Sequence, residues 1–362
     1  MLFDELRNGF YAEAIKNAVS EQSIVLDLGA GLGLHGFIAA IAGARKTYLV
    51  DPSPILQITE SVVAANGLKD RVCCIQKTIE ETTLPESVDV IVSVFTGNFL
   101  LTEDLLPSLF YARDKFLRPG GTLIPDRAEM EIALVSAPEF YKKVIEGWTE
   151  GLFGVDYSAV RQFAANSIYY DTPEAMVPIL LSDPGLLQEM NLVTATEAAC
   201  RNRIEVTVKK SGTCHGCVGW FNIHVGNNWL STSPLKKQTH WRQVFLPLAE
   251  PLDLTTGETV GIELHRPEFG EWTWTIETAK ARQRQSTFFS EPHNLQLLQK
   301  RKDDYRPGMG AKGRVLQEII QRIGRGESNA VIAKGILQAF PELFPSQNHA
   351  QSFLLKLIEK YF

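Results

Sequence analysis

The first third of the chain alternates short apolar runs with longer stretches whose apolar residues recur at helical spacing. The apolar runs predict strands at Ser23–Leu28, Lys46–Val50, Arg71–Gln76 and Val88–Val94. A fifth strand is predicted to begin with Thr122–Ile124. The stretches between them predict helices at His35–Ala44, Pro54–Asn66 and Leu105–Leu117. Because Val88–Val94 is apolar almost throughout, it is typical of a parallel strand covered on both faces. The alternation predicts a doubly wound, Rossmann-like α/β domain.

The pattern changes after about Asp126. Residues of alternating polarity predict antiparallel strands of a β-barrel or sandwich at Glu129–Ser136, Arg203–Lys209, Val218–Val225, Arg242–Pro247, Thr259–Leu264 and Glu271–Glu277. The intervening Ala137–Met190 is predicted to be mainly helical or irregular. Helical spacing returns after about Pro292, at Gly313–Ile323, Ala330–Phe340 and His349–Tyr361. We therefore expect a Rossmann-like domain over 1–126, a β-barrel domain over 127–292 and a small α-helical C-terminal module over 293–362.

Charge is distributed unevenly over these three parts. The 362 residues carry a net charge of −6. Residues 1–126 hold 10 basic and 16 acidic groups, residues 127–292 hold 15 and 20, and residues 293–362 hold 11 and 6. An acidic body disfavours a nucleic-acid partner and suits a cationic ligand. No apolar run approaches the roughly 18 residues of a membrane span, and five cysteines, an odd number, suggest a reducing compartment. We expect a cytoplasmic protein with no membrane contact.

A glycine-rich turn follows the first predicted strand. Val25–Gly33 reads VLDLGAGLG, in which Gly29 and Gly31 allow a sharp turn and a close approach to a ligand. Asp51 ends the next strand, where a carboxylate binds a ribose diol in both NAD and S-adenosylmethionine sites. Asp27 favours S-adenosylmethionine, because an acid so near the turn would repel a pyrophosphate. An NAD-dependent oxidoreductase remains the alternative.

Motifs further along the chain carry a family resemblance. Ser93–Asp126 reads SVFTGNFLLTEDLLPSLFYARDKFLRPGGTLIPD, and Thr239-His240-Trp241 lies in the predicted barrel. Both segments resemble the protein arginine N-methyltransferase family, as do Trp220-Phe221 and Ser231-Thr232-Ser233-Pro234. The resemblance extends from about Met1 to Glu277. It implies an S-adenosylmethionine-dependent N-methyltransferase that acts on an arginine or a related guanidino or peptide substrate.

The resemblance also implies roles for single residues. Asp51 corresponds to the carboxylate that holds the ribose, and Gly29 and Gly31 to the backbone that approaches the cofactor. Glu80 would accept a hydrogen bond from the adenine amino group. Arg7, in MLFDELRN, would hold the methionine carboxylate. Because the family forms dimers through an arm of the barrel, we expect a homodimer with a helical arm near 172–191.

The substrate loop departs from the family pattern. The family grips a guanidinium with two glutamates, and this sequence keeps the second as Glu103 but has Val94 in place of the first. A guanidinium stays protonated at any physiological pH. Losing one partner of a buried ionic cluster typically costs about 3–5 kcal/mol. We expect Val94 and Trp241 to line the substrate pocket.

A second departure concerns the N-terminus. The sequence begins after the position of the family's aromatic-rich helix, which folds over the cofactor. The resemblance implies that in the family this helix carries the acid that pairs with the histidine of the threonine–histidine–tryptophan motif. His240 is therefore expected to lack its usual partner and either to act as a base, to be paired elsewhere or to be structural.

Three functional readings follow. The enzyme methylates a guanidino nitrogen with Glu103, helped by Asp104 or by a substrate group. Alternatively it methylates an imidazole, amine or hydroxyl of a peptide, protein or small molecule, with Glu103 or His240 as the general base. In the third reading it is a catalytically silent relative that binds the cofactor and a partner. We expect no metal, because Cys214-His215-Gly216-Cys217 has no second cysteine pair.

Overall fold

The computed structural model describes residues 1–94 and 96–361. The chain divides into two compact units, Met1–Pro292 and a second unit that begins at His293. Over the described residues, none of the helices combines the length and the apolar character that crossing a bilayer requires.

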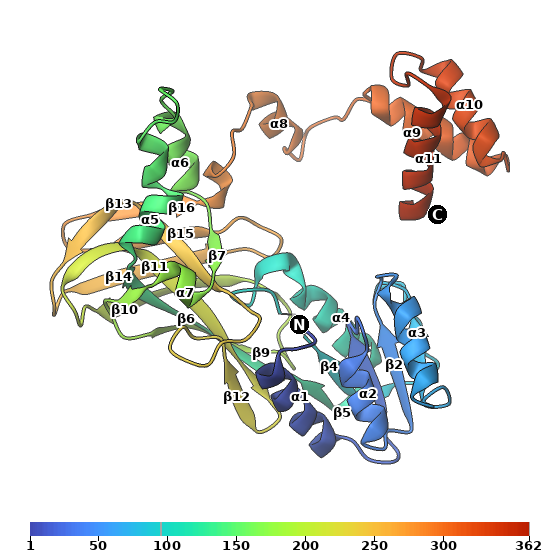
Figure 1. Ribbon diagram of the computed structural model, residues 1–362, viewed down its shortest axis with the longest axis horizontal. Coiled ribbons are helices and arrows are strands. Elements are labelled where there is room, and N and C mark those ends of the chain that lie inside the picture. The colour runs from blue at the N-terminus through green and yellow to red at the C-terminus, as the bar shows by residue number, and fades with distance from the viewer. Residues whose placement is uncertain (95, 362) are drawn as a thin grey trace. The chain divides into compact units, whose positions relative to one another are not determined.

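The first unit opens with a five-stranded parallel sheet of order β3-β2-β1-β4-β5 (Figure 1). Its strands are β1 (Ile24–Leu28), β2 (Lys46–Val50), β3 (Val72–Ile75), β4 (Val88–Ser93) and β5 (Leu117–Ile124). The predicted strands are confirmed, although β5 begins at Leu117, at the end of a predicted helix. The strand order reverses between β1 and β4, and such a switch point opens a crevice for ligands at the carboxyl ends of the strands.

Four helices accompany this sheet: α1 (Glu5–Ala18), α2 (Leu34–Ile41), α3 (Ile55–Ala65) and α4 (Leu106–Phe116). Helix α1 begins after Asp4, whose side chain accepts a hydrogen bond from the backbone N–H of Arg7 at 3.0 Å. It contacts α2 and also strands β11 (Gly212–Val225) and β12 (Asn228–Ser231) of the following domain. A side chain at Gly226 would clash with Ala14 of α1, so the two surfaces approach closely. Helix α1 therefore links the sheet to the barrel.

The barrel-like domain consists of two antiparallel sheets. One contains β10 (Cys200–Thr207), β14 (Thr259–Arg266), β15 (Thr273–Glu277) and β16 (Arg282–Ser286). The other is built around β11 and contains β6 (Arg127–Ser136), β7 (Tyr169–Asp171), β8 (Ile179–Leu180), β9 (Gly185–Asn191), β12 and β13 (Gln243–Leu254). The fold class expected from the sequence, a Rossmann-like domain, a barrel and C-terminal helices, is confirmed.

The segment between β6 and β10 differs from the prediction. Residues 172–191, expected to form a helical arm, contain only one helical turn, α7 (Pro173–Met176), before β8 and β9. Strand β9 pairs with β6. Its apolar residues do not alternate in sequence, since Leu186 and Leu187 are adjacent and the buried residues Leu187 and Met190 are three positions apart, so the sequence carries no period-two signal.

The helical projection of the barrel lies earlier in the chain, between β6 and β7 (Figure 1). It comprises α5 (Pro138–Val144), two short 3₁₀ helices (Glu146–Thr149 and Ser158–Val160) and α6 (Arg161–Ala164).

The second unit contains α8 (Leu295–Lys300), α9 (Ala311–Gly324), α10 (Asn329–Ala339) and α11 (Gln347–Tyr361). The three helices predicted here are confirmed as α9, α10 and α11. They share a separate core that includes Val315, Ile319, Ile332, Ile336 and Leu354. No residue of α8 is buried.

Candidate active site

The glycine-rich turn joins β1 to α2 and is built from left-handed backbone. Gly29, Gly31 and Gly33 have φ angles of 71°, 51° and 77°. A side chain at Gly33 would lie 2.6 Å from Leu49, whereas one at Gly31 would meet nothing within 4 Å. Gly33 is therefore required by both packing and conformation. At Gly31 only conformation requires glycine, and the space beside it is open to a ligand.

Asp51, at the end of β2, lies against this turn. Its Oδ2 accepts a hydrogen bond from the Gly31 N–H at 2.9 Å, and its Oδ1 accepts from the Ser53 N–H at 2.8 Å. Two backbone donors thus fix the carboxylate beside the open face of Gly31. The structure brings Gly29, Gly31 and Asp51 together at the switch point.

Asp27 lies below the turn and is buried. Its Oδ2 accepts a hydrogen bond from the Gly36 N–H in α2 at 2.7 Å. Burial, with a smaller contribution from the charge of Asp51, raises the pKa of Asp27 to about 7, although the hydrogen bond from Gly36 opposes this. Asp27 ties the strand end to the first turn of α2.

Arg7 of α1 is 2% exposed, and only some of its guanidinium N–H groups make hydrogen bonds. Its Nη2 donates to the carbonyl of Met1 and to Asn8 Oδ1, both at 2.8 Å. Its Nη1 is buried and has no hydrogen-bond partner among the described residues. The guanidinium lies over the ring of Trp241, 5.8 Å from the ring centroid. A buried guanidinium N–H without a partner is suited to an anionic group such as a carboxylate.

Glu80 is exposed and lies after β3. Its Oε1 accepts a hydrogen bond from Ser108 Oγ of α4 at 2.6 Å, and its backbone carbonyl accepts from the Tyr111 hydroxyl at 3.2 Å. Helix α4 therefore holds Glu80 in place at the edge of the sheet.

The loop after β4 carries the predicted substrate residues. Val94 packs against the main hydrophobic core. Further along, Phe99, Leu100, Glu103 and Asp104 all have positive φ angles, of 49°, 63°, 69° and 51°. Such backbone costs on the order of 1–3 kcal/mol per residue and persists only where its surroundings hold it.

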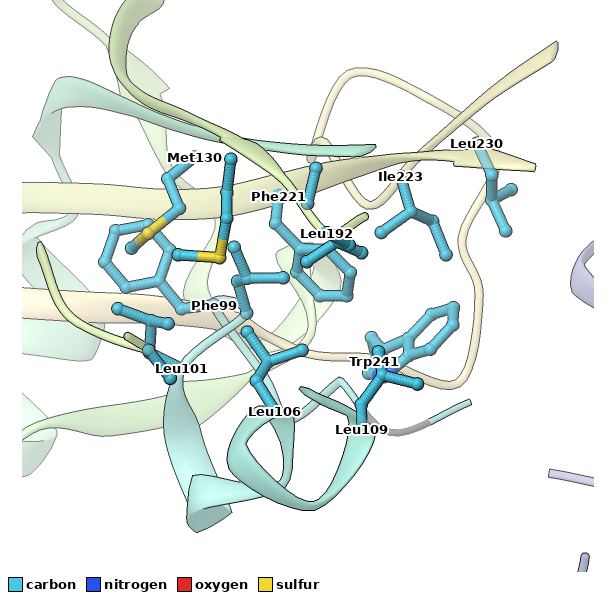
Figure 2. Close-up of a cluster of buried hydrophobic side chains, with 14 of the residues drawn as sticks. Phe99, Leu101, Leu106, Leu109, Met130, Leu192, Phe221, Ile223, Leu230 and Trp241 are labelled. Atoms are coloured by element: carbon cyan, nitrogen blue, oxygen red, sulfur yellow. The ribbon is translucent and has the colours of Figure 1, made fainter. Parts of the chain in front are cut away.

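The barrel supplies that support. Figure 2 shows Phe99 and Leu101 of the loop, with Leu106 and Leu109 of α4, among barrel side chains that include Met130, Phe221, Ile223 and Trp241. Phe99 and Leu101 are buried in this core. A side chain at Gly97 would lie 1.9 Å from the Thr102 carbonyl, so the loop folds tightly back on itself.

Glu103 and Asp104 differ in their surroundings although they are neighbours. Glu103 is exposed and makes no hydrogen bond or ion pair within the part of the chain that the structure describes. Asp104 forms an ion pair with Arg266 at 2.5 Å and accepts a hydrogen bond from the Phe269 N–H at 3.1 Å. Asp104 Oδ1 is therefore held by the barrel, whereas Glu103 has no such partner among the described residues, and the alternative in which a substrate group assists Glu103 is favoured.

Tyr170 of β7 lies near both Glu103 and Arg266. Burial outweighs the Arg266 charge, which lowers the Tyr170 pKa, and together with the Glu103 charge it raises that pKa to about 12. The hydroxyl therefore stays neutral beside the Glu103 carboxylate. Tyr170 was not among the site residues predicted from the sequence.

His240 has a carboxylate partner, which agrees with the alternative that it is paired elsewhere. Its Nδ1 lies 2.9 Å from Asp4 Oδ2, and its backbone N–H donates to the same oxygen at 2.8 Å. The acid is the residue that precedes the first turn of α1. It lies three residues before Arg7, where its Oδ1 also caps α1.

The electrostatics of this pair define its protonation. Burial opposes ionisation of Asp4, but hydrogen bonds from Arg7 and His240 outweigh it and lower the Asp4 pKa. Burial lowers the pKa of His240, and the Arg7 charge adds to this against the effect of Asp4. At neutral pH the pair is a carboxylate and a neutral imidazole, which places the ring hydrogen on Nδ1 and leaves Nε2 as a base.

Trp241 joins the two halves of the site. Its Nε1 donates to the Thr96 carbonyl at 2.9 Å, and the next residue, Arg242, donates its N–H to Asn98 Oδ1 at 2.8 Å. The ring also stacks against His240, with 4.2 Å between centroids. The segment before β13 thus holds the loop that carries Glu103 beside α1 and Arg7.

The CHGC motif lies elsewhere, in β11. Cys214 and Cys217 are both buried there, and burial raises the pKa of each thiol. They behave as apolar core residues.

Two family models match the chain: a methyltransferase domain over residues 25–121 and an arginine methyltransferase oligomerization subdomain over residues 126–269. Protein arginine N-methyltransferase 6 of Danio rerio is 37% identical over 278 residues, which cover 70% of this chain and 76% of that protein. The chain belongs to the protein arginine N-methyltransferase family. It is an S-adenosylmethionine-dependent methyltransferase.

Other members of the family are similar to this chain in sequence or in fold. Protein arginine N-methyltransferase 1 of Schizosaccharomyces pombe is 32% identical over 267 residues, 72% of this chain and 78% of the relative. The solved Trypanosoma brucei PRMT1 enzyme-prozyme heterotetrameric complex with AdoHcy includes a chain that is 26% identical, with a TM-score of 0.72, over 79% of this chain and 96% of that one. Arabidopsis thaliana protein arginine methyltransferase 10 shares the fold, at 24% identity and a TM-score of 0.67, over 79% of this chain and 96% of that one.

Proposed function

We propose that this methyltransferase transfers the methyl group of S-adenosylmethionine to a nitrogen of an arginine side chain, or of a related guanidino group, in a peptide or protein. The names of its relatives support this substrate class. The observation that carries the proposal is the Trp241–Thr96 hydrogen bond, which joins the Glu103 loop to the elements that hold Arg7 and His240.

The residues present fit the cofactor. The unpartnered Nη1 of Arg7 is suited to the methionine carboxylate, and the Asp51 carboxylate at the open face of Gly31 is suited to the ribose hydroxyls. Glu80 is assigned to the adenine amino group, and Gly29 allows close approach of the backbone. When bound, the cofactor supplies a methyl group on a positively charged sulfur.

The protein aligns the acceptor and manages its charge. Glu103 pairs with the guanidinium and draws positive charge away from the nitrogen that attacks. With the cofactor bound, the site would hold the acceptor nitrogen in line with the methyl group, which would pass to that nitrogen while its bonding electron pair stays on the sulfur. The methylated nitrogen then loses one proton, which His240 Nε2 accepts while Asp4 stabilises the imidazolium.

A second candidate is a less basic acceptor, an imidazole, amine or hydroxyl. The observation that favours it is the apolar Val94 packed on the core at the position where the family has a glutamate. With Asp104 paired to Arg266, Glu103 is the free carboxylate of the described loop. An acceptor that loses its proton near neutral pH requires only one carboxylate.

The test is methyl transfer from labelled cofactor to matched peptides that differ only in arginine, histidine, lysine or serine, with mass spectrometry of the product. Label on arginine supports the first proposal, and label on another residue alone supports the second. Val94→Glu is the matched variant: if it alone creates arginine methylation, the wild-type enzyme uses another acceptor. Cofactor binding by calorimetry with no transfer to any acceptor would contradict both proposals and indicate a silent relative.

We also propose a homodimer formed through the projection between β6 and β7. Its tip exposes Trp148, Leu152, Phe153 and Val155, and Phe153 is 98% exposed. Such an apolar surface is typical of an interface. Light scattering of the wild type should give twice the mass of one chain, and the Phe153→Ser variant should give the mass of a single chain. A wild-type monomer at micromolar concentration contradicts this proposal.

The expected domain limits, 1–126, 127–292 and 293–362, and a cytoplasmic location remain proposals. Limited proteolysis should cut first within residues 301–310, which are all exposed, and so separate the barrel from the last three helices. Fractionation of cells should recover the protein in the cytoplasm; recovery in another compartment contradicts the location.

A further inference from the structure

His35 is a buried polar side chain that the proposed mechanism does not use. It occupies the first turn of α2, immediately after the glycine-rich turn, and is 7% exposed. Its ring packs on Tyr11 of α1, with 4.8 Å between centroids. Its Nε2 is buried and has no hydrogen-bond partner among the described residues. A buried nitrogen left in this state costs free energy unless a ligand satisfies it.

Arg7 supplies a second unsatisfied group in the same region. Its Nη1 is also buried without a partner among the described residues. Burial, together with the nearby charge of Arg7, lowers the pKa of His35 to about 4. At neutral pH the imidazole is therefore uncharged and can carry its hydrogen on Nε2. Arg7 lies one helical turn before Tyr11 in α1, and Tyr11 packs on His35, so a cationic donor and a neutral donor lie on the same side of α1 beside the glycine-rich turn.

The chemical group that satisfies two such donors is a carboxylate, because it presents two acceptor oxygens and one negative charge. Tyr11 does not compete for this role, since its hydroxyl already donates to the Ser93 carbonyl at 3.0 Å. We propose that His35 is a second side-chain donor to the methionine carboxylate of the bound cofactor, beside Arg7. This inference rests on the cofactor assignment above.

The consequence is selectivity for ligands that carry the amino acid end. S-Adenosylhomocysteine has this carboxylate, whereas 5′-methylthioadenosine has the same nucleoside and sulfur without it. His35 therefore contributes to the affinity of the first ligand and not to that of the second.

The experiment is calorimetric titration of the full chain with each ligand. His35→Leu should weaken S-adenosylhomocysteine binding about tenfold or more and change 5′-methylthioadenosine binding less than about threefold. His35→Gln retains a donor and should lose less affinity than His35→Leu. Tyr11→Phe is the matched control, because it alters the neighbouring ring without removing an unsatisfied donor.

Thermal unfolding provides a second readout. Without ligand, His35→Leu should be at least as stable as the wild type, and S-adenosylhomocysteine should raise its Tm less than it raises that of the wild type. Equal losses for both ligands, or no loss for S-adenosylhomocysteine, would overturn the role of His35. A wild type that binds neither ligand would instead overturn the proposed function.

Discussion

The ring Nδ1 of His240 lies 2.9 Å from the carboxylate of Asp4, although 236 positions separate the two residues. This contact connects the barrel to the first turn of α1, where Asp4 also caps the helix and Arg7 faces Trp241. Asp4 therefore caps helix α1 and pairs with the imidazole of His240. Because it fixes the start of α1, it also positions Arg7.

The first prediction concerns this acid. Asp4→Asn should lower kcat by about 10²-fold, because the imidazole loses the carboxylate that stabilises its protonated form. Asparagine caps helices as well as aspartate does, so the fold should be retained. Steady-state kinetics and S-adenosylhomocysteine titration measure the two effects. A large loss of cofactor affinity with unchanged kcat would show that Asp4 serves only to place α1.

Glu103 should be required for turnover. Glu103→Gln should lower kcat about 10²–10³-fold, since a neutral amide cannot draw charge from the acceptor. Because the side chain is exposed and makes no ion pair with described residues, Tm should hardly change. The control is Glu5→Gln, in the exposed first turn of α1. Activity within threefold of wild type in the Glu103 variant would exclude this carboxylate from the reaction.

Gly97 should be irreplaceable in the substrate loop. Gly97→Ala places a methyl group 1.9 Å from the Thr102 carbonyl and should destabilise the protein by about 1–3 kcal/mol while abolishing transfer. Gly9→Ala is the matched variant, because this helical glycine has nothing within 4 Å and should gain about 0.5–1 kcal/mol. Denaturant unfolding gives both free energies, and similar values for the two variants would contradict the geometry of the loop.

The pH dependence of stability should report on His35. Its pKa is about 4 in the folded protein and 6.5 in an exposed chain, so the unfolded state binds the proton first as pH falls. The wild type therefore loses stability between about pH 6.5 and 4, and His35→Leu does not. Relative to the wild type, the variant should gain up to about 1.4 kcal/mol per pH unit in this window.

Unfolding of both proteins at pH 7, 6 and 5 measures this difference. Asp27, whose raised pKa acts in the opposite direction, is present in both proteins and cancels. A difference that stays constant over the three pH values would show that folding leaves the pKa of His35 unchanged and would contradict this prediction.

The local sequence pattern was sufficient to predict the strands of the Rossmann-like sheet, the glycine-rich turn and the position of Asp51 at the end of its strand. These features depend on residues close in sequence: period, chain reversal at Gly31, and a carboxylate that follows its strand directly. The resemblance to the family added Arg7 and Glu103 to the candidate site residues. Strand β9 was missed because a strand without alternation is recognisable only by its partner β6.

The partners of the charged groups were decided by the tertiary structure. Asp104 pairs with Arg266 across 162 positions and Asp4 with His240 across 236, and no local signal distinguishes these acids from the exposed Glu103. The lone donors of Arg7 and His35 likewise become apparent only when α1 packs on α2. The sequence by itself determined which elements form and which chemical groups they carry, because these follow from neighbouring residues. Only the packing of distant elements decided which groups are already satisfied and which remain for the cofactor and its acceptor.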